Sequence, residues 1–216
     1  MSEDYNIAER ITDSYLSRGQ IKPEYIYLKA MLLAKRQRFE DARAYFERLS
    51  NYGGRWAEYA ETGKGDTYFL AGDFRSAEII YGNFLKSYPR SDTAPDVIYR
   101  YALCLRKQGS WPEAKKALTD LTARYPKSIS ASYARRILDE DEFYFTIQVG
   151  SFLNYDNAHA LSREIFAKGF NSYVKKVVHQ GRFYYRVRVG QFSSRVEADA
   201  QFRRLASLGY SGIIYP

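Results

Sequence analysis

The chain has 216 residues and a mass of 25.1 kDa, which suits one large domain or two small ones. Hydrophobic residues make up 45% and charged residues 27%, a globular balance that excludes whole-chain disorder, collagen and coiled coil. Residues 143–216 hold ten Lys/Arg and four Asp/Glu, a net +6 out of the total of +8. A basic surface of this kind attracts nucleic acid, anionic lipid or acidic polymers.

Neither a metal nor a cofactor is expected. Cys104 is the single cysteine of the chain, and neither His159 nor His179 has another His or a Cys at ligand spacing. No apolar run approaches the roughly 20 residues of a transmembrane helix. The first residues have neither a basic nor an apolar region, so the chain reads as cytosolic or as a mature form whose leader has been removed.

Residues 1–140 are predicted to form a helical repeat. Its small anchor residues lie 35 and 37 positions apart, at Ala42, Ala77 and Ala114. This spacing is close to the ~34-residue period of tetratricopeptide repeats (TPRs), and the segment resembles a TPR array. We expect three helix pairs, with a leading helix at 5–18 and a capping helix at 130–140.

Two details of the repeat concern packing and subfamily. Gly65 is a small residue that allows neighbouring helices to approach closely, and Tyr81 is expected to fill the next groove. Tyr88-Pro89 and Tyr125-Pro126 end the second helices of their pairs, since the residue before proline disfavours the α region. These endings resemble the TPRs of bacterial envelope proteins. The resemblance implies a protein partner on the concave face, which the sequence does not identify.

After Asp139–Glu142, which is interpreted as a linker, the chain becomes rich in β-forming residues. Segments 143–152 and 183–192 match at a shift of 40, which indicates a duplicated strand–helix–strand unit. The order βαββαβ predicts a ferredoxin-like sheet with two helices on one face and the first and third strands central. The predicted fold is thus an all-α domain at 1–140 and an α+β domain at 143–216. The remaining predicted elements are helices at 155–168 and 195–208 and strands at 171–180 and 212–215.

Side chains alternate between the two faces of a strand. This alternation predicts a helix-covered core face with Phe145, Ile147 and Val149 on the first strand, joined by Tyr185, Val187 and Val189 on the third. The open face then carries an aromatic, polar and basic strip formed by Tyr144, Thr146, Gln148, Tyr184, Arg186 and Arg188.

Residues 143–216 resemble a SPOR (sporulation-related repeat) domain. The motifs that carry the resemblance are Ile147–Phe152, Tyr184–Gly190 and Gly209–Ile214. SPOR domains are bacterial envelope modules that bind peptidoglycan glycan strands without stem peptides, which are enriched at division septa. The resemblance implies a periplasmic or envelope location and glycan contacts by Gln148, Ser151, Tyr184, Arg186 and Ile214. The open strip adds Thr146, Arg188 and Tyr144 to the candidate glycan-binding residues.

Three alternatives stay open at this point. RNA-recognition domains share this topology and stack bases on two central strands, where Tyr144 and Tyr184 would lie. The segment Arg182–Tyr185, however, lacks the small residues of their third-strand motif. In the second alternative the protein is a pure TPR adaptor, and its last domain has no binding role. An enzyme is not expected, because the chain has no HExxH, GxSxG or P-loop motif.

Overall fold

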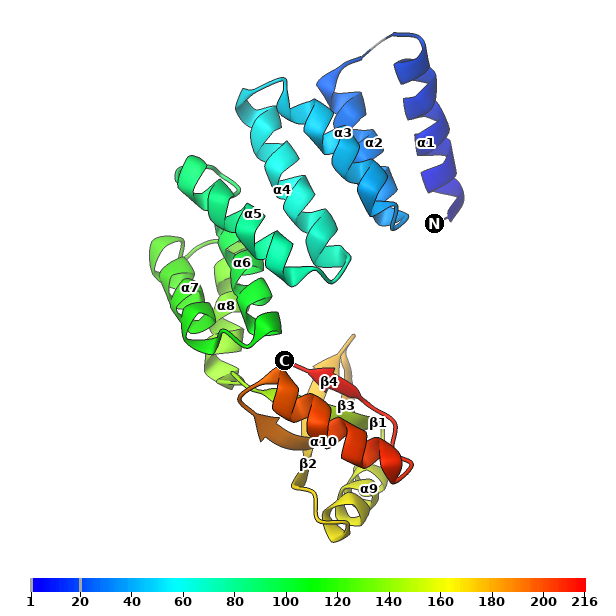
Figure 1. Cartoon of the computed structure of the whole chain (residues 1–216), viewed down its shortest axis with the longest axis vertical. Helices are drawn as coiled ribbons and strands as arrows, with labels where there is room; N and C mark the ends of the chain where they lie inside the picture. Colours follow the sequence, from blue (N-terminus) through cyan, green and yellow to red (C-terminus); the bar gives the residue numbers. More distant parts are fainter. Residues whose placement is uncertain (1, 20) are drawn as a thin grey trace. The chain divides into compact units, whose positions relative to one another are not determined.

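The computed structural model describes residues 2–19 and 21–216, and it divides into two compact units (Figure 1). The first unit comprises the chain up to Asp139 except Gly109–Trp111, and it is helical. The second comprises Gly109–Trp111 and Glu140–Pro216, and it contains the sheet.

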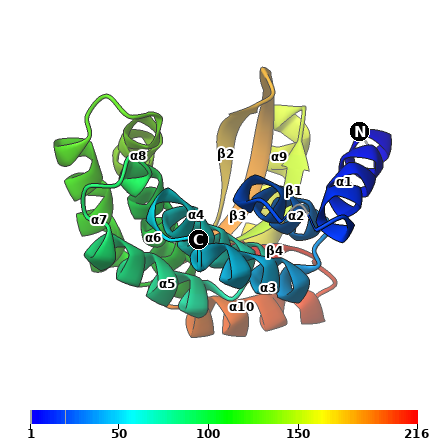
Figure 2. The ribbon, with the colours of Figure 1, turned by 90° about the horizontal axis from the view of Figure 1, so that it is seen from above.

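The helices of the first unit form successive antiparallel pairs, as the repeat spacing predicts. The pairs are α2/α3, α4/α5 and α6/α7, with α1 leading and α8 closing the array, and Figure 2 shows them following an arc. The predicted TPR-like fold is therefore confirmed. The helices are α1 (Ser2–Ser17), α2 (Pro23–Lys35), α3 (Phe39–Ser50), α4 (Gly54–Leu70), α5 (Phe74–Ser87), α6 (Ala94–Gln108), α7 (Trp111–Arg124) and α8 (Ile129–Glu140).

Helix α4 packs closely against the helices on both sides of it because it has glycines at the two contact points. A Cβ atom built on Gly63 would lie 2.3 Å from the ring of Phe46, and one built on Gly65 would lie 2.5 Å from the ring of Tyr81. Both rings are fully buried, so they have little room to move. Gly65 thus allows the close helix approach that was predicted for it, and the ring that it admits is that of Tyr81.

The second unit is a four-stranded antiparallel sheet in the order β2-β3-β1-β4, with β1 and β3 central as predicted. Helices α9 and α10 lie on one face (Figure 1), and their apolar residues share a core with the sheet. The elements are β1 (Phe145–Phe152), α9 (Tyr155–Ala167), β2 (Ser172–His179), β3 (Arg182–Phe192), α10 (Arg195–Ser207) and β4 (Ile213–Tyr215). The buried core residues are Ile147, Ala158, Ile165, Phe170, Val187, Val189 and Leu205.

The duplication is visible in how α9 and α10 end. Gly169 and Gly209 follow the two helices with φ of +87° and +89°, a left-handed conformation that glycine adopts without strain. Their N–H groups donate to carbonyls three residues earlier, at 2.9 and 3.0 Å. Equivalent positions of the two halves therefore stop their helices in the same way.

Strand β1 contains a bulge that the alternation argument did not anticipate. Gln148 pairs with Arg188, but Gly150 pairs with Val187, so β1 has one extra residue at Val149. Such an extra residue reverses the alternation of the residues that follow it. Gly150 consequently lies on the core face, and Ser151 lies on the open face.

Candidate functional site

The open face of the sheet is the candidate site. Arg188, Arg186 and Tyr184 follow one another on this face of β3, where the pairing with β2 is regular. On β1, Gln148 lies opposite Arg188, and Ser151 lies opposite Arg186. Strict alternation would have placed Ser151 in the core, so its position beside Arg186 depends on the bulge at Val149. The structure thus brings together five of the predicted residues.

Tyr184 is the aromatic residue of this face. Its side chain is partly exposed and lies opposite Val177 of β2. The ring of His179 meets it edge-on, with 6.3 Å between the ring centroids. A tyrosine held in this way has an apolar face suited to the C–H face of a pyranose ring and a hydroxyl for hydrogen bonding.

Arg186 and Gln148 carry polar atoms that are buried without a partner. The side chain of Arg186 makes no hydrogen bond or ion pair with the residues that the structure describes, and its Nε atom is buried. The Oε1 atom of Gln148 is also buried and accepts no hydrogen bond from the described residues. Unsatisfied buried polar atoms are uncommon in folded proteins, and a ligand with hydroxyl or amide groups satisfies them.

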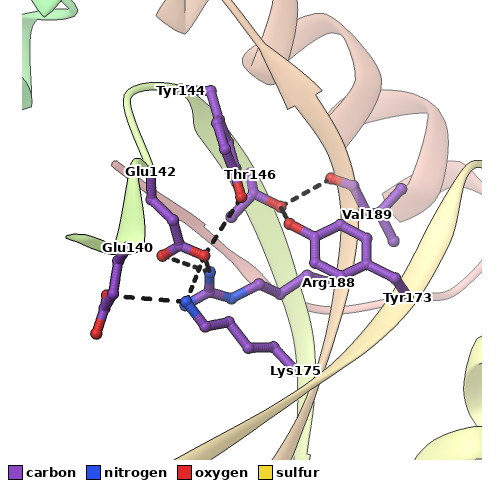
Figure 3. Close-up of polar contacts among 8 residues, drawn as sticks. All are labelled: Glu140, Glu142, Tyr144, Thr146, Tyr173, Lys175, Arg188 and Val189. Atoms are coloured by element: carbon purple, nitrogen blue, oxygen red, sulfur yellow. Dashed lines mark hydrogen bonds and ion pairs between the residues drawn. The ribbon is translucent and has the colours of Figure 1, made fainter. Parts of the chain in front are cut away.

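Arg188 is held differently, in a cluster of charges at one end of the face (Figure 3). Its side chain is 3% exposed, and Nη1 donates to Oε1 and Oε2 of Glu142 at 3.0 and 3.1 Å. Lys175 of β2 donates to the same carboxylate at 2.5 Å and lies 3.8 Å from Glu140. The ring of Tyr215 lies 5.3 Å from the guanidinium carbon. The positive charges of Arg188 and Lys175 are therefore compensated within this unit.

The charge cluster shifts the ionisation of its members. Burial alone would raise the pKa of Glu142, but the hydrogen bond from Lys175 and the charge of Arg188 outweigh it and lower that pKa. Burial would likewise lower the pKa of Arg188, whereas Glu142 raises it. Each partner thus favours the charged form of the other.

Thr146 and Tyr144 belong to the surroundings of this cluster. Thr146 is 1% exposed; its hydroxyl donates to the carbonyl of Val189 at 3.3 Å and lies 3.4 Å from the hydroxyl of Tyr173. The Tyr144 hydroxyl donates to Glu142 at 3.3 Å, and burial is the main reason why its pKa is raised. The predicted strip thus has a buried part, where Thr146 and the Nη1 atom of Arg188 have partners within the protein, although the Nε atom of Arg188 is buried without one.

The structure corrects the placement of Ile214. The register pairs it with Ile147, and its side chain packs against the core on the helix-covered face. Its neighbour Ile213, which is 59% exposed, lies opposite Gln148 on the open face instead. Strand β4 begins one residue later than predicted, and this short strand was too weak a pattern to assign its faces from sequence.

Sequence reasoning missed Glu142, Tyr173 and Lys175. Glu142 lies in an acidic segment that was interpreted as a linker, and the other two lie on an edge strand that was not assigned faces. The periodic alternation of Tyr173, Lys175 and Val177 along β2 is a pattern that would have found two of them.

In the part of the chain that the structure describes, no group of three His, Cys, Asp or Glu side chains is arranged to hold a metal ion. Likewise, no helix within residues 2–19 and 21–216 has the length and apolar character needed to cross a membrane. Cys104 is buried, and this burial raises the pKa of its thiol to about 12.

Comparison with known proteins agrees with this architecture. The family model described as SPOR domain matches residues 141–216, and the model described as tetratricopeptide repeat matches residues 96–128. The second match covers the α6/α7 pair. No curated protein matches the chain significantly.

Two solved structures are similar to the last third of the chain. One is the peptidoglycan-binding domain of the B. subtilis cell wall lytic enzyme CwlC, which is 34% identical; the match covers 33% of this chain and 85% of that one, with a TM-score of 0.29. The other is the SPOR domain of RlpA from Pseudomonas aeruginosa, which is 22% identical; the match covers 33% and 97%, with a TM-score of 0.31.

The fold and the open face of the sheet together define a helical-repeat protein with a sheet-based binding module. The family matches make the assignment specific: the chain is a TPR-repeat protein with a C-terminal SPOR domain. Both are families of binding domains rather than of catalytic ones.

Proposed function

We propose that the SPOR domain binds peptidoglycan glycan strands without stem peptides on the open face of its sheet, while the TPR unit docks a protein partner. In this proposal the protein acts without catalysis in the bacterial envelope, on the periplasmic side, in cell division or envelope maintenance. The match of the SPOR family model to residues 141–216 supports the ligand class.

The observation that carries the proposal is the bulge at Val149. It places Gln148 and Ser151, three residues apart in sequence, on the same face as Arg186 and Tyr184. A sugar polymer needs an aromatic face for its C–H surface and directional donors and acceptors for its hydroxyl and acetamido groups. These four side chains supply both on a rigid sheet.

The charge cluster favours a glycan over RNA. A nucleic-acid surface gains its affinity from cations that pair with phosphates. On this face, however, Glu142 already pairs with Arg188 and Lys175. A ligand with few charges fits the remaining surface better than a polyanion does.

The test is binding to amidase-treated peptidoglycan sacculi, with an RNA of comparable length as the competing ligand. Tyr184→Ala removes the stacking ring and should weaken glycan binding by about 1–3 kcal/mol, or roughly 5- to 150-fold. Thermal melts accompany every variant. The proposal fails if wild-type protein prefers RNA, if Tyr184→Ala binds glycan normally, or if the loss only follows a fall in melting temperature.

Tyr185 is the matched control for this experiment. It is adjacent in sequence but packs against the core on the helix-covered face. Tyr185→Ala should lower the melting temperature because it removes core packing. Under conditions in which Tyr185→Ala is fully folded, this variant should bind glycan normally. Normal binding by Tyr185→Ala, beside weakened binding by Tyr184→Ala, would show that the two adjacent tyrosines have different roles.

The proposed partner site is a groove on the TPR unit between α4, α6 and α8. It has a volume of about 530 Å³, and its apolar lining includes Phe69, Leu70, Tyr99, Leu103, Ile129 and Tyr133. Asp66 lies at its edge, where it pairs with Arg100 at 3.0 Å and accepts a hydrogen bond from Tyr81 at 2.6 Å. Because this carboxylate has its own partners, we propose that an apolar peptide segment or helix of a partner binds here through the groove's side chains.

Ile129 provides the test of this docking site, since it is 73% exposed on the groove. Ile129→Glu should reduce co-precipitation of the specific partner by full-length protein from envelope extracts. Ile79 is a matched control, 56% exposed on α5 and absent from the groove lining. Docking at the groove is refuted if Ile79→Glu and Ile129→Glu reduce capture equally, or if neither does.

A further inference from the structure

We infer that Arg186 is the subsite for the carboxylate that removal of the stem peptide leaves on muramic acid. This inference rests on the proposed function, and it names the chemical group that the open face recognises. It makes Arg186 a specificity-determining residue, one that distinguishes a stripped strand from an intact one by charge as well as by size.

The position of Arg186 supports this role. It lies in the middle of the open face, between Ser151 on β1 and Lys175 on β2, with Tyr184 two residues further along β3. The side chain is partly buried, its Nε atom is buried, and it has no hydrogen-bond or ion-pair partner among the described residues. Such a guanidinium keeps its N–H donors available for an acceptor on a ligand.

Two other cations of the face, Arg188 and Lys175, are already neutralised. Glu142 accepts from Arg188 and from Lys175, and Glu140 lies 3.8 Å from Lys175. Arg182 shares this face but is exposed at the end of β3, so among the described residues of the face Arg186 is the cation that is both partly buried and without a partner. A single localised charge suits a ligand with isolated carboxylates better than one with closely spaced phosphates.

The ligand's chemistry supplies such a carboxylate. In intact peptidoglycan the lactyl group of each muramic acid is joined to its stem peptide by a neutral amide. Hydrolysis of that amide removes the peptide and leaves a carboxylate, which is negative at neutral pH. The planar guanidinium of arginine binds a carboxylate through two parallel N–H···O bonds, and an amide offers one oxygen and no charge.

The experiment compares two ligands of equal length with the full-length protein. One is a stripped oligosaccharide with free lactyl carboxylates, and the other is the same oligosaccharide with those carboxylates converted to primary amides. Wild-type protein should bind the carboxylate form about tenfold more tightly, as a charge-assisted hydrogen bond at a partly buried site implies. The preference should shrink at high salt.

The variants localise the effect. Arg186→Gln should bind both forms equally, and Arg186→Lys should keep part of the preference. Arg182→Gln is the control, since Arg182 is an exposed cation at the other end of the same strand, and it should keep the full preference. Melting temperatures identify any variant that is misfolded. If Arg186→Gln does not fold, the ratio of the two affinities in Arg186→Lys tests the inference instead.

Four results would overturn the inference. Equal binding of the two ligands by wild-type protein would do so and would leave the proposed glycan binding intact. A loss of both ligands to the same degree in Arg186→Gln would show that Arg186 contacts a neutral part of the sugar. Loss of the preference in Arg182→Gln would indicate general charge attraction. Failure of wild-type protein to bind either ligand would refute both the inference and the proposed function.

Discussion

Glu142 and Arg188, which are 46 residues apart in sequence, are joined by two contacts of 3.0 and 3.1 Å between one guanidinium nitrogen and both carboxylate oxygens. The contact connects the segment before β1 to the centre of the sheet. Glu142 is therefore a structural part of the SPOR domain, and we propose that a functional boundary of this domain lies before Glu142 rather than after it.

Removing the carboxylate should destabilise the SPOR domain. Glu142→Ala leaves Arg188 buried without its partner, a change that costs about 3–5 kcal/mol when a buried pair is broken. The measurement is the free energy of unfolding from denaturant melts. Glu140→Ala is the control, because that side chain is 50% exposed and lies 3.8 Å from Lys175, so its effect should be under about 1 kcal/mol. Equal effects of the two variants would contradict the assignment.

The same carboxylate should make stability depend on pH. Because Lys175 and Arg188 lower the pKa of Glu142 in the folded protein below its usual 4.5, the unfolded chain takes up a proton first as the pH falls. The stabilisation is complete above the unfolded-state pKa and is lost as the pH falls through the lowered folded-state pKa. Melts between pH 7 and pH 3 should fall more steeply for wild-type protein than for Glu142→Gln. Parallel curves would be inconsistent with this linkage.

Arg186 and Arg188 should respond differently to the same substitution. Arg188→Gln removes a buried, paired cation and should lower the melting temperature markedly, since the partly buried carboxylate of Glu142 then loses the guanidinium that pairs with it. Arg186→Gln removes a partly exposed, unpaired cation and should change stability by about 0.5 kcal/mol or less. Differential scanning calorimetry of the two variants provides the comparison. A larger loss for Arg186→Gln would reverse the assigned roles.

Two glycines of the TPR unit form a further matched pair. Gly65→Ala should destabilise the array, because the new Cβ atom would lie 2.5 Å from the buried ring of Tyr81. Gly82→Ala on α5 meets only an ordinary contact, 3.6 Å from Tyr101, and should stabilise by about 0.5–1 kcal/mol through helix propensity. Chemical melts of both variants check the opposite signs, and a stabilising Gly65→Ala would disprove the close-packing argument.

Periodic features of this chain could be predicted from its sequence, and irregular ones could not. The spacing of Ala42, Ala77 and Ala114 predicted the helix pairs because each pair repeats the same packing. The 40-residue shift predicted the sheet topology for the same reason. The bulge at Val149 breaks the period of two on which face assignments depend. Alternation alone therefore puts Ser151 on the core face, and only the family resemblance predicted it as a residue of the site.

The burial of Arg188 was also beyond sequence reasoning. Its partner Glu142 is distant in the chain and lies among other acidic residues, where nothing distinguishes a paired carboxylate from a solvated one. Alternation predicted correctly that Arg186 and Arg188 share a face. It carried no information about which of the two would meet a carboxylate of the same chain.

Gly150 and Gly190 occupy equivalent places in the two halves of the duplicated unit, but the constraints on them differ. A Cβ atom built on either glycine would crowd the ring of the phenylalanine two residues later, Phe152 or Phe192, and Gly190 also has a φ of +68°, whereas Gly150 lacks a positive φ. Volume thus constrains both positions, and backbone conformation constrains Gly190 in addition. The same residue type can therefore be required for different reasons in the two halves of a duplicated unit. Smaller neighbouring side chains would make alanine acceptable at Gly150, but no repacking of neighbours would remove the conformational strain of alanine at Gly190.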